Sequence, residues 1–334
     1  MTRRSSLLLT TLILLLALAA GAGLRFAWFL RQAVEPPAPR LVVIPPGTSF
    51  ARVASHLEAE GVIAGAFEFK VLSRLRGDAH SIKAGEYDFR APSAPGKVLD
   101  RLITGDVRRL KFTVPEGLNL TEIAAKLEVE GRGDKTAFLA LARDPVFIST
   151  LGFDAPTLEG YLFPETYTLE SGTSEERLIK AMVEQFRTRL GAAELVAAAA
   201  ERGLDLHQLV TLASIIQKEA GNEAEMPVIS GVFHNRLRLR MPLQADPTVI
   251  YGIVDFDGNL TRKHLNTPSP YNTYRMRGLP AGPIASPGEK ALRAAAMPAT
   301  VDYLYFVSQG DGTHVFSKTL KEHNNMVRRY QLRR

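Results

Sequence analysis

The chain has 334 residues, of which 46% are hydrophobic and 23% are charged, and its formal net charge at neutral pH is +6. It contains no cysteine, which excludes disulfides, thiolate chemistry and lipid attachment through a cysteine. The positive charge suits an anionic polymer or a membrane surface but is too small to indicate a nucleic acid as a partner. The length is enough for roughly two domains.

The N-terminal stretch predicts a single membrane span. Two arginines precede an uncharged run from Ser5 to Leu24, and Trp28 follows it. About 20 apolar residues cross a bilayer, the arginines favour the cytoplasmic side, and aromatic residues suit the far interface. We therefore expect a cytoplasmic tail over residues 1–6 and a transmembrane anchor over residues 7–30. The rest of the chain would lie on the periplasmic side of the inner membrane. A signal peptide cleaved near Ala22 is the alternative.

A strand–turn–helix pattern occurs twice after the span. Prolines indicate a stiff linker over residues 31–40. Val43–Gly47 and Val114–Gly117 each combine a strand end with a Pro/Gly turn, and each precedes an amphipathic helical pattern that ends at a glycine. Between the two copies we expect a helix over 67–75, a strand over 85–90 and a helix over 97–103.

The repeated unit resembles the LysM module, a small fold that binds glycans containing N-acetylglucosamine. We expect a LysM-like α/β subdomain over residues 41–111 and a larger α+β domain over residues 112–334. A structural spacer and a glycan-binding surface are equally compatible with this pattern, because a fold alone does not give a function. The aromatic stretch from Leu158 to Tyr167 indicates core packing, or alternatively the wall of a groove.

The region from Asp205 to Arg240 predicts two helices joined around Gly221, with Glu219 at the end of the first. Asp205 begins that helix as an N-cap. At helical spacing Glu219 has Ile215 and Ile216 as surface neighbours. An aliphatic environment removes water from the carboxyl and raises its pKa, which a general acid working near neutral pH requires. The alternative is a carboxylate that bends into solvent or pairs with the neighbouring lysine.

The second helix and the long Pro- and Gly-rich segment after it contain many groups suited to sugars. Aromatic faces stack on sugar rings, and amide, carboxylate and guanidinium groups hydrogen-bond hydroxyl and N-acetyl groups. A long segment of this kind in a compact domain is usually functional. The candidate substrate-binding residues are Asn235, Arg236, Gln244, Asp246, Thr248, Tyr251, Tyr271, Asn272 and Tyr274.

Several motifs in the same order resemble the YceG-like endolytic murein transglycosylases. The motifs are Ser214–Glu219, Val232–Leu237, Leu243–Tyr251, Thr267–Tyr274, Gly278–Ile284, Tyr303–Val307, His314–Phe316 and Glu322–Asn324. With the LysM-like region and the N-terminal span, the resemblance covers nearly the whole chain. It implies that residues 112–334 form a catalytic domain that cleaves MurNAc–GlcNAc bonds within nascent peptidoglycan strands without water. The products would have 1,6-anhydroMurNAc ends, and cleavage would terminate or release strands during cell-wall synthesis.

The resemblance also implies roles for individual residues. Glu219 matches the catalytic glutamate, which protonates the glycosidic oxygen and then accepts a proton from the MurNAc C6 hydroxyl. A single carboxyl that is acid first and base second benefits from a raised pKa. Asp246 would bind substrate or brace its loop. We expect no cofactor and no metal, and peptidoglycan and penicillin-binding synthases as partners. A non-catalytic glycan-binding scaffold and a lysozyme-like muramidase that uses Asp246 are the alternatives.

Overall fold

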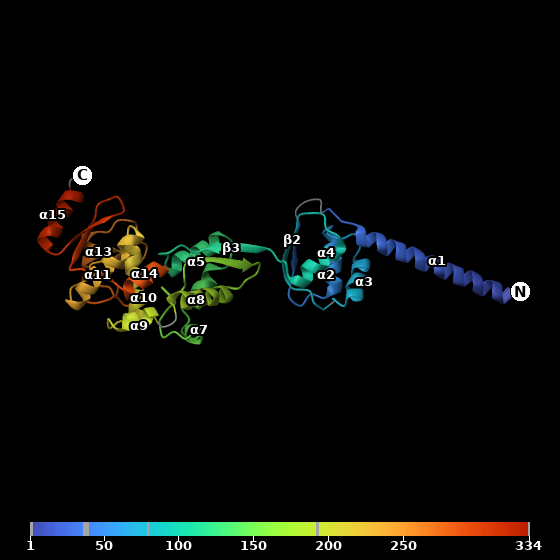
Figure 1. The fold of residues 1–334 in the computed structure, drawn as a ribbon, viewed down its shortest axis with the longest axis horizontal. Coiled ribbons are helices and arrows are strands. Elements are labelled where there is room, and N and C mark those ends of the chain that lie inside the picture. Colours follow the sequence, from blue (N-terminus) through green and yellow to red (C-terminus); the bar gives the residue numbers. More distant parts are fainter. Residues whose placement is uncertain (1–2, 36–39, 79, 192–193, 333–334) are drawn as a thin grey trace. The chain divides into compact units, whose positions relative to one another are not determined.

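The computed structural model describes residues 3–35, 40–78, 80–191 and 194–332 (Figure 1). The chain forms two compact units. Unit 1 comprises Met1–Leu110 and Thr168–Gly172, and unit 2 comprises Lys111–Tyr167 and Thr173–Arg334. The division after Leu110 falls one residue from the boundary expected between the LysM-like and catalytic regions.

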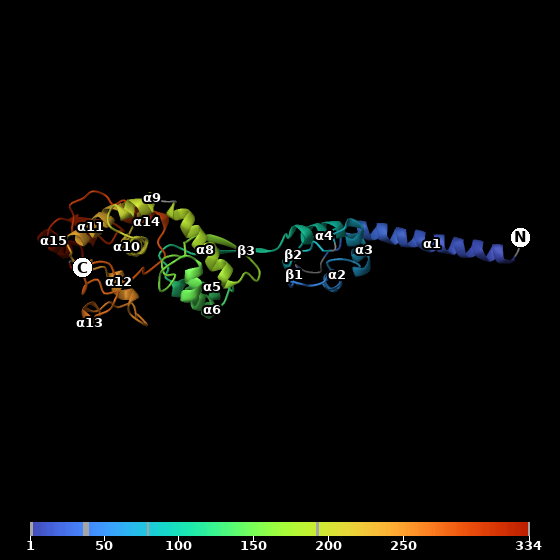
Figure 2. The same ribbon diagram turned by 90° about the horizontal axis from the view of Figure 1, so that it is seen from below.

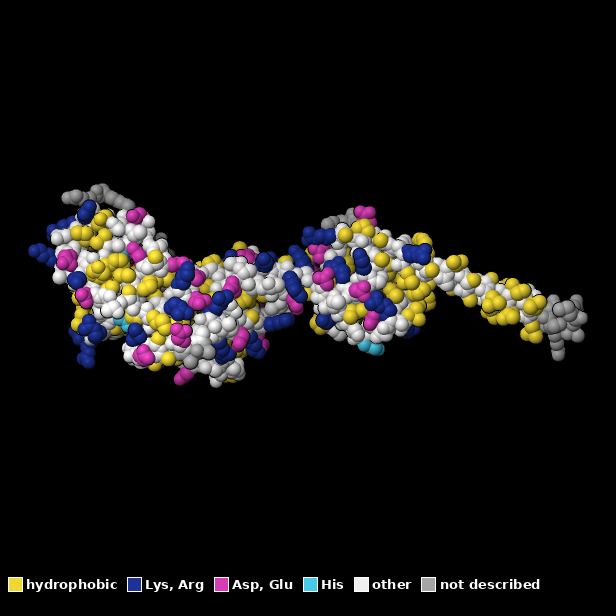
Figure 3. Space-filling view, in the orientation of Figure 1, with side chains coloured by type: hydrophobic (Ala, Val, Ile, Leu, Met, Phe, Trp, Pro, Cys, Tyr) yellow, Lys and Arg dark blue, Asp and Glu magenta, His cyan; other side chains and the backbone are white. Residues whose placement is uncertain are grey.

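The first helix, α1 (Arg3–Arg31), contains a stretch that is long and apolar enough to span a membrane, from Leu8 to Arg31 with a mean hydropathy of 2.0. At about 1.5 Å per residue this stretch is ~36 Å long, against a hydrocarbon core of ~30 Å. Hydrophobic side chains cover much of its visible surface (Figure 3). This agrees with the predicted anchor. Part of the predicted tail, residues 1–2, lies outside the described residues.

The last turns of α1 pack into unit 1, which corrects the expectation that the aromatic residues there face the membrane interface. Phe29 is only 2% exposed within the core of unit 1, and Phe26 packs against the same core. Arg25 Nε donates to Glu68 Oε1 at 2.6 Å. Trp28, 63% exposed, is the aromatic residue that remains free for an interface.

The predicted linker over residues 31–40 lies between α1 and the first strand, and its role as a stiff linker stays a prediction. Helix α1 includes Arg31, Val34 pairs with Ser93 in an isolated bridge, and the first strand begins at Arg40. Residues 36–39, with all three prolines of this stretch, lie outside the described residues. Unit 1 therefore packs directly on the end of the helix.

Unit 1 is a small mixed layer of helices and one antiparallel strand pair. Its elements are β1 (Arg40–Ile44), α2 (Phe50–Ala59), α3 (Ala66–Arg76), β2 (Gly85–Phe89) and α4 (Pro95–Thr104). The strands pair so that Val42 lies opposite Tyr87, and both side chains are fully buried. The two helices and the strand expected between the repeats are confirmed. A LysM-like identity for the unit stays a prediction.

Both copies of the repeat have the same turn and stop signals. The turn glycines Gly47 and Gly117 have φ angles of 75° and 81°, and the stop glycines Gly61 and Gly131 have φ angles of 68° and 62°. Residues other than glycine rarely adopt this left-handed backbone conformation, so the glycines set where each helix begins and ends. The second copy leads into α5 (Leu120–Val129).

Unit 2 is mainly helical. Its further elements are α6 (Lys135–Ala142), α7 (Pro145–Thr150), α8 (Glu175–Leu190), α9 (Glu194–Ala200), α10 (Leu206–Glu219), the 3-10 turn η1 (Glu223–Glu225), α11 (Met226–Arg238), α12 (Asp246–Tyr251), α13 (Arg262–Asn266), α14 (Glu289–Ala296), β5 (Tyr305–Ser308), β6 (His314–Ser317) and α15 (Leu320–Tyr330). Strands β5 and β6 form an antiparallel hairpin. Strands β3 (Arg109–Thr113) and β4 (Thr166–Glu170) pair with each other, and the division between the units runs through both. The mixture of helices and strands agrees with the expected α+β class.

Helix α10 is the centre of unit 2. It packs against α14, α11, α9 and α12, and α14 lies beside it in both ribbon views (Figures 1 and 2). The surface of α14 toward the core is mostly alanine, which lets the two helices approach closely. Every residue of α10 from Leu209 to Ile216 is buried, so the helix is surrounded on all sides.

Thr211 and Ser214 on α10 form a polar stripe within this packed core. Ser214 Oγ donates to the Thr211 carbonyl at 2.7 Å and accepts from Ile284 N at 3.0 Å. Thr211 Oγ1 donates to the His207 carbonyl at 2.7 Å. The stripe therefore holds the segment around Ile284 against the helix. In the aromatic stretch before it, Tyr161 and Phe163 are buried, which confirms the expectation of core packing.

Candidate active site

Both ends of α10 are defined by local chemistry. The predicted N-cap at Asp205 is confirmed and is part of a capping box. Asp205 Oδ1 accepts from Gln208 N at 2.8 Å, and Gln208 Oε1 accepts from Asp205 N at 3.0 Å. The end of the helix lacks the left-handed glycine with which helices commonly stop. Ala220 is the C-cap in an extended conformation, and Gly221 does not have a left-handed φ. A Cβ on Gly221 would lie 2.4 Å from the Gly312 carbonyl oxygen, so glycine permits a close approach of two backbones.

The turn after Glu219 is fastened to the β5–β6 hairpin. Asn222 Nδ2 donates to the Gly312 carbonyl at 2.9 Å. His314 donates from its backbone N to Glu225 Oε1 at 3.0 Å and from its ring Nδ1 to Glu225 Oε2 at 2.8 Å. Asn222 also caps η1, because its side chain accepts from Glu225 N. These contacts fix the direction in which α10 presents its last residue.

Glu219 opens onto a pocket of about 500 Å³, which we call the Glu219 pocket. Five of the predicted site residues line it: Glu219, Arg236, Gln244, Asp246 and Tyr274. The structure therefore brings together groups from α10, α11, α12 and the loop that follows α13. Other walls come from the hairpin and from α15, through Tyr305, His314 and His323. Tyr305, His314 and His323 were not predicted as site residues, although each lies in one of the motifs that resemble the YceG-like family.

The carboxyl of Glu219 is desolvated and accepts no hydrogen bond within the described part of the chain. Burial raises its pKa to about 8, the negative charge of Asp246 adds to the increase, and the positive charge of Arg236 opposes it. Lys218 does not pair with it, because Lys218 Nζ donates to the Gly117 carbonyl at 3.2 Å. A carboxyl in this setting is protonated at neutral pH and free to donate its proton into the pocket.

Arg236 is a fixed cation in the same pocket. It is 6% exposed, and Nε donates to the Leu304 carbonyl at 2.7 Å while Nη1 donates to the Leu243 carbonyl at 2.8 Å. The guanidinium lies over the ring of Tyr305 at 5.2 Å. Its Nη2 has no partner among the described residues, so two N–H groups stay available for a ligand. Rigid positioning by carbonyls suits a group that orients a substrate.

Asp246 is exposed at the start of α12, and its Oδ1 accepts from the Tyr274 hydroxyl at 2.5 Å. The neighbouring Gln244 has a φ of 51°, an uncommon conformation for a residue with a side chain. Gln244 N donates to the Thr273 carbonyl at 3.1 Å, and Ala245 N donates to Thr273 Oγ1 at 3.0 Å. Thr273 thus braces the loop that presents Gln244 and Asp246.

Two predicted binding residues are fully buried and hydrogen-bonded to their own segment. Thr248 is 0% exposed, and its Oγ1 donates to the Ala245 carbonyl at 2.7 Å. Asn272 is 0% exposed, and its Nδ2 lies within hydrogen-bonding distance of three carbonyls, the closest being Thr267 at 2.7 Å. In this conformation both side chains satisfy backbone groups of the long segment instead of facing the Glu219 pocket.

Three more predicted residues also lie outside the Glu219 pocket. Tyr251 donates its hydroxyl to Glu159 Oε2 at 2.9 Å, and Tyr271 packs edge-on against Tyr251. Asn235 Nδ2 donates to the Val301 carbonyl at 2.8 Å, on a different side of α11 from Arg236. Their direct contact with substrate stays a prediction. In the part of the chain that the structure describes, no cluster of His, Cys, Asp or Glu could hold a metal ion.

The residues of this pocket lie within the part of the chain that matches a known protein family. The YceG-like family matches residues 42–329, a range that includes every residue of the pocket named above. The endolytic murein transglycosylase of Bacillus subtilis is 36% identical over 303 residues, which cover 86% of this chain and 83% of that protein. That of Streptococcus pneumoniae is 28% identical over 318 residues, which cover 86% of this chain and 57% of that protein.

A crystal structure of a YceG-like protein from Listeria monocytogenes resembles the fold described here. It is 32% identical in sequence, has a TM-score of 0.60, and the match covers 86% of this chain and 98% of that one. The sequence motifs, the family match and the structural likeness agree. The chain belongs to the YceG-like family.

Proposed function

We propose that this protein is an endolytic murein transglycosylase that cleaves MurNAc–GlcNAc bonds within nascent peptidoglycan strands. The observation that carries the proposal is the carboxyl of Glu219, which lines an open pocket, accepts no hydrogen bond among the described residues, and has a pKa raised to about 8 by burial. The names of the relatives in Bacillus subtilis and Streptococcus pneumoniae support the same activity.

In the proposed reaction, the Glu219 carboxyl donates its proton to the glycosidic oxygen, and the bond from MurNAc C1 to that oxygen breaks. The GlcNAc unit leaves with a new hydroxyl, and positive charge develops at C1 and the ring oxygen. The C6 hydroxyl of the same MurNAc attacks C1 and gives its proton to the Glu219 carboxylate. The product is a 1,6-anhydro ring, no water is consumed, and Glu219 is again protonated.

The neighbours of Glu219 would serve both halves of this cycle. Burial and the charge of Asp246 favour the protonated form of Glu219. The positive charge of Arg236 stabilises the carboxylate that forms after proton donation. The free N–H groups of Arg236 would orient the sugar, and Asp246 with Tyr274 would bind hydroxyl groups at the pocket edge. We assign Asp246 a binding role and not that of a nucleophile.

The same proposal includes location and partners. Helix α1 would anchor the protein in the inner membrane by a single pass, with both units on the periplasmic side. This position would bring the pocket to nascent strands, and penicillin-binding synthases are the proposed partners. The packing of Phe29 into unit 1 favours a unit 1 held close to the membrane surface.

Digestion of purified peptidoglycan in water enriched with oxygen-18 tests the reaction. A transglycosylase yields 1,6-anhydro ends without the heavy isotope. A muramidase would yield reducing ends that carry it, and a non-catalytic scaffold would release no fragments. Mass spectrometry of the fragments separates the three results, and the Glu219→Gln variant, purified in parallel, controls for contaminating enzymes.

A further inference from the structure

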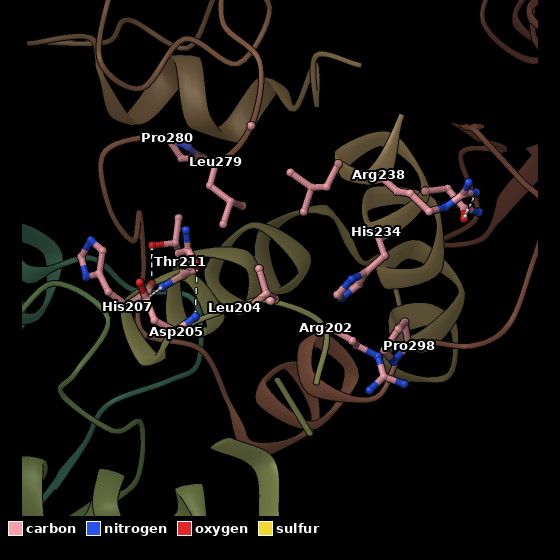
Figure 4. A pocket seen from close by; sticks show the side chains of 15 residues that line it. Arg202, Leu204, Asp205, His207, Thr211, His234, Arg238, Leu279, Pro280 and Pro298 are labelled. Atoms are coloured by element: carbon pink, nitrogen blue, oxygen red, sulfur yellow. Dashed lines mark hydrogen bonds between the residues drawn. The ribbon is translucent and has the colours of Figure 1, made fainter. Parts of the chain in front are cut away.

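A second and larger cavity lies at the opposite end of α10 from Glu219. It has a volume of about 840 Å³, and we call it the α10 N-terminal pocket (Figure 4). Leu204, Leu237 and Leu279 contribute to its lining, and Leu204 and Leu279 point toward its middle. Arg202 and Arg238 also line it, away from these leucines in the view of Figure 4. An apolar centre with cationic groups beside it fits a ligand that has small apolar groups and carboxylates.

Neither arginine has a carboxylate partner among the described residues. Arg202 Nη1 donates to the Ala198 carbonyl at 3.0 Å, and Arg238 Nη2 donates to Asn235 Oδ1 at 3.3 Å. Asp205 is the carboxylate in the described lining, and its Oδ1 is occupied by the capping box of α10. Both guanidinium groups therefore keep N–H groups free for an anionic ligand.

Elements of the Glu219 pocket also build this second pocket. On α11, Asn235 lines the α10 N-terminal pocket and the next residue, Arg236, lines the Glu219 pocket. The loop from Tyr274 to Leu279 contributes its first residue to the Glu219 pocket and its last to the other. The two pockets are therefore built from the same structural elements, although their lining residues differ.

The length of α10 between the residues that line the two pockets is comparable to the reach of a short peptide. Along α10, at about 1.5 Å per residue, Glu219 lies ~12–21 Å from the pocket residues between Asp205 and Thr211. A peptide of five residues in an extended conformation spans up to about 17 Å. The stem peptide of peptidoglycan is attached to MurNAc, contains alanine methyl groups, and carries free carboxylates.

We infer that the α10 N-terminal pocket binds the acidic stem peptide of the strand whose glycosidic bond lies at Glu219. Alanine methyl groups contact the leucines, and the peptide carboxylates pair with Arg202 and Arg238. The inference rests on the proposed transglycosylase function and extends it from the glycan to the peptide. The second pocket then selects strands that still carry stem peptides, while the Glu219 pocket performs the cleavage.

The test compares kcat/KM of the full-length protein in detergent on two substrates, namely peptide-bearing glycan strands and the same strands stripped by an amidase. We expect kcat/KM of the wild type to be about 2- to 30-fold higher on peptide-bearing strands, which is the contribution expected from two exposed ion pairs. The Arg202→Ala/Arg238→Ala variant should lose this preference and keep its rate on stripped strands. The matched Arg262→Ala/Lys263→Ala variant removes the same charge from α13, which lines neither pocket, and should retain the preference.

The outcomes separate this inference from the function on which it rests. If the wild type cleaves both substrates at equal rates, or the Arg202/Arg238 variant slows on both alike, the peptide role is wrong and the transglycosylase stands. If the wild type cleaves neither, the proposed function itself fails. Partial recovery of the preference in Arg202→Lys/Arg238→Lys would support charge pairing. A change in mass in solution without a change in preference would instead indicate a second protein copy as the occupant and overturn the inference.

Discussion

Unit 2 contains two carboxyls with strongly raised pKa values, and their surroundings differ. Glu159 is 4% exposed, and burial raises its pKa to about 7. Both of its oxygens lie 3.2 Å from Leu120 N, and Oε2 accepts from the Tyr251 hydroxyl at 2.9 Å. Glu219 has a pKa of about 8, accepts no hydrogen bond among the described residues, and lines an open pocket.

The difference shows that burial and a raised pKa do not by themselves identify a catalytic acid. Glu159 has the properties of a structural carboxyl, because its hydrogen bonds join the first residue of α5 to the end of α12. Glu219 has the properties of a reactive one, because its proton can reach a ligand and nothing in the described structure competes for its oxygens. Substitutions at the two positions should therefore affect different measurements.

The largest expected difference is in catalysis. Glu219→Gln retains the size of the side chain but cannot transfer a proton, and we expect activity to fall by about 10²–10⁴-fold, the usual contribution of general acid–base catalysis. Glu159→Gln should change the rate by less than about tenfold, because Glu159 lines neither pocket. Release of anhydro-ended fragments measures both. A folded Glu219→Gln protein that cuts at the normal rate would refute the mechanism.

The pH dependence of the wild type follows from the same pKa. Glu219 must be protonated to begin the reaction, so kcat/KM should be constant at lower pH and fall about tenfold per pH unit above about 8. An ordinary carboxyl would give a loss that begins near pH 4–5. Initial rates between pH 5 and pH 10 locate the midpoint. A midpoint below pH 6 would show that Glu219 is solvated during the reaction.

For stability, the substitution at Glu159 should have the larger effect and the substitution at Glu219 the smaller one. Glu159→Ala leaves Leu120 N and the Tyr251 hydroxyl without an acceptor in the interior, and we expect a loss of about 1–3 kcal/mol. Glu219→Ala removes no hydrogen bond seen among the described residues and should cost less. Thermal melts at pH 6, where both carboxyls are largely protonated, compare the two variants. Equal losses would contradict the division into structural and reactive carboxyls.

The raised pKa of each carboxyl also predicts how stability depends on pH. A carboxyl whose folded pKa exceeds its unfolded value stabilises the fold at low pH and loses that contribution as pH rises to the folded pKa. The wild type should therefore become less stable between about pH 4.5 and pH 8. Glu219→Gln removes part of this slope, and at pH 9 we expect it to be more stable than the wild type by ~1–3 kcal/mol. Melts of both proteins at pH 5 and pH 9 measure the difference.

Local signals in the sequence predicted α10 well, while the pocket around its end depends on distant segments. The capping box of Asp205 and the position of Glu219 follow from residues within one helix. The desolvation of Glu219 was predicted in direction, but hairpin and α15 residues more than 80 positions away contribute pocket walls. No helical pattern contains that information. The polar groups of the long segment suggested sugar contacts, yet Thr248 and Asn272 turn inward because buried backbone groups need partners.

The smallest effect concerns Asp246, whose charge is one reason for the raised pKa of Glu219. Asp246→Asn removes that repulsion, so the pKa of Glu219 should fall and the alkaline limb of kcat/KM should move to lower pH by about 0.3–1 unit. At pH 8 to 9 the rate would then fall by about twofold to tenfold, while at pH 6 it would change little. Tyr274→Phe is the matched control, because it removes the hydrogen bond to Asp246 at 2.5 Å and leaves the negative charge in place. That variant should not move the alkaline limb to lower pH.

If Asp246 were a second catalytic carboxylate, Asp246→Asn would instead lose activity by a hundredfold or more at every pH, as general acid–base contributions of about 10²–10⁴-fold require. A pH-independent loss of that size would restore the muramidase alternative, whereas a shift confined to the alkaline limb would leave Glu219 as the single acid and base.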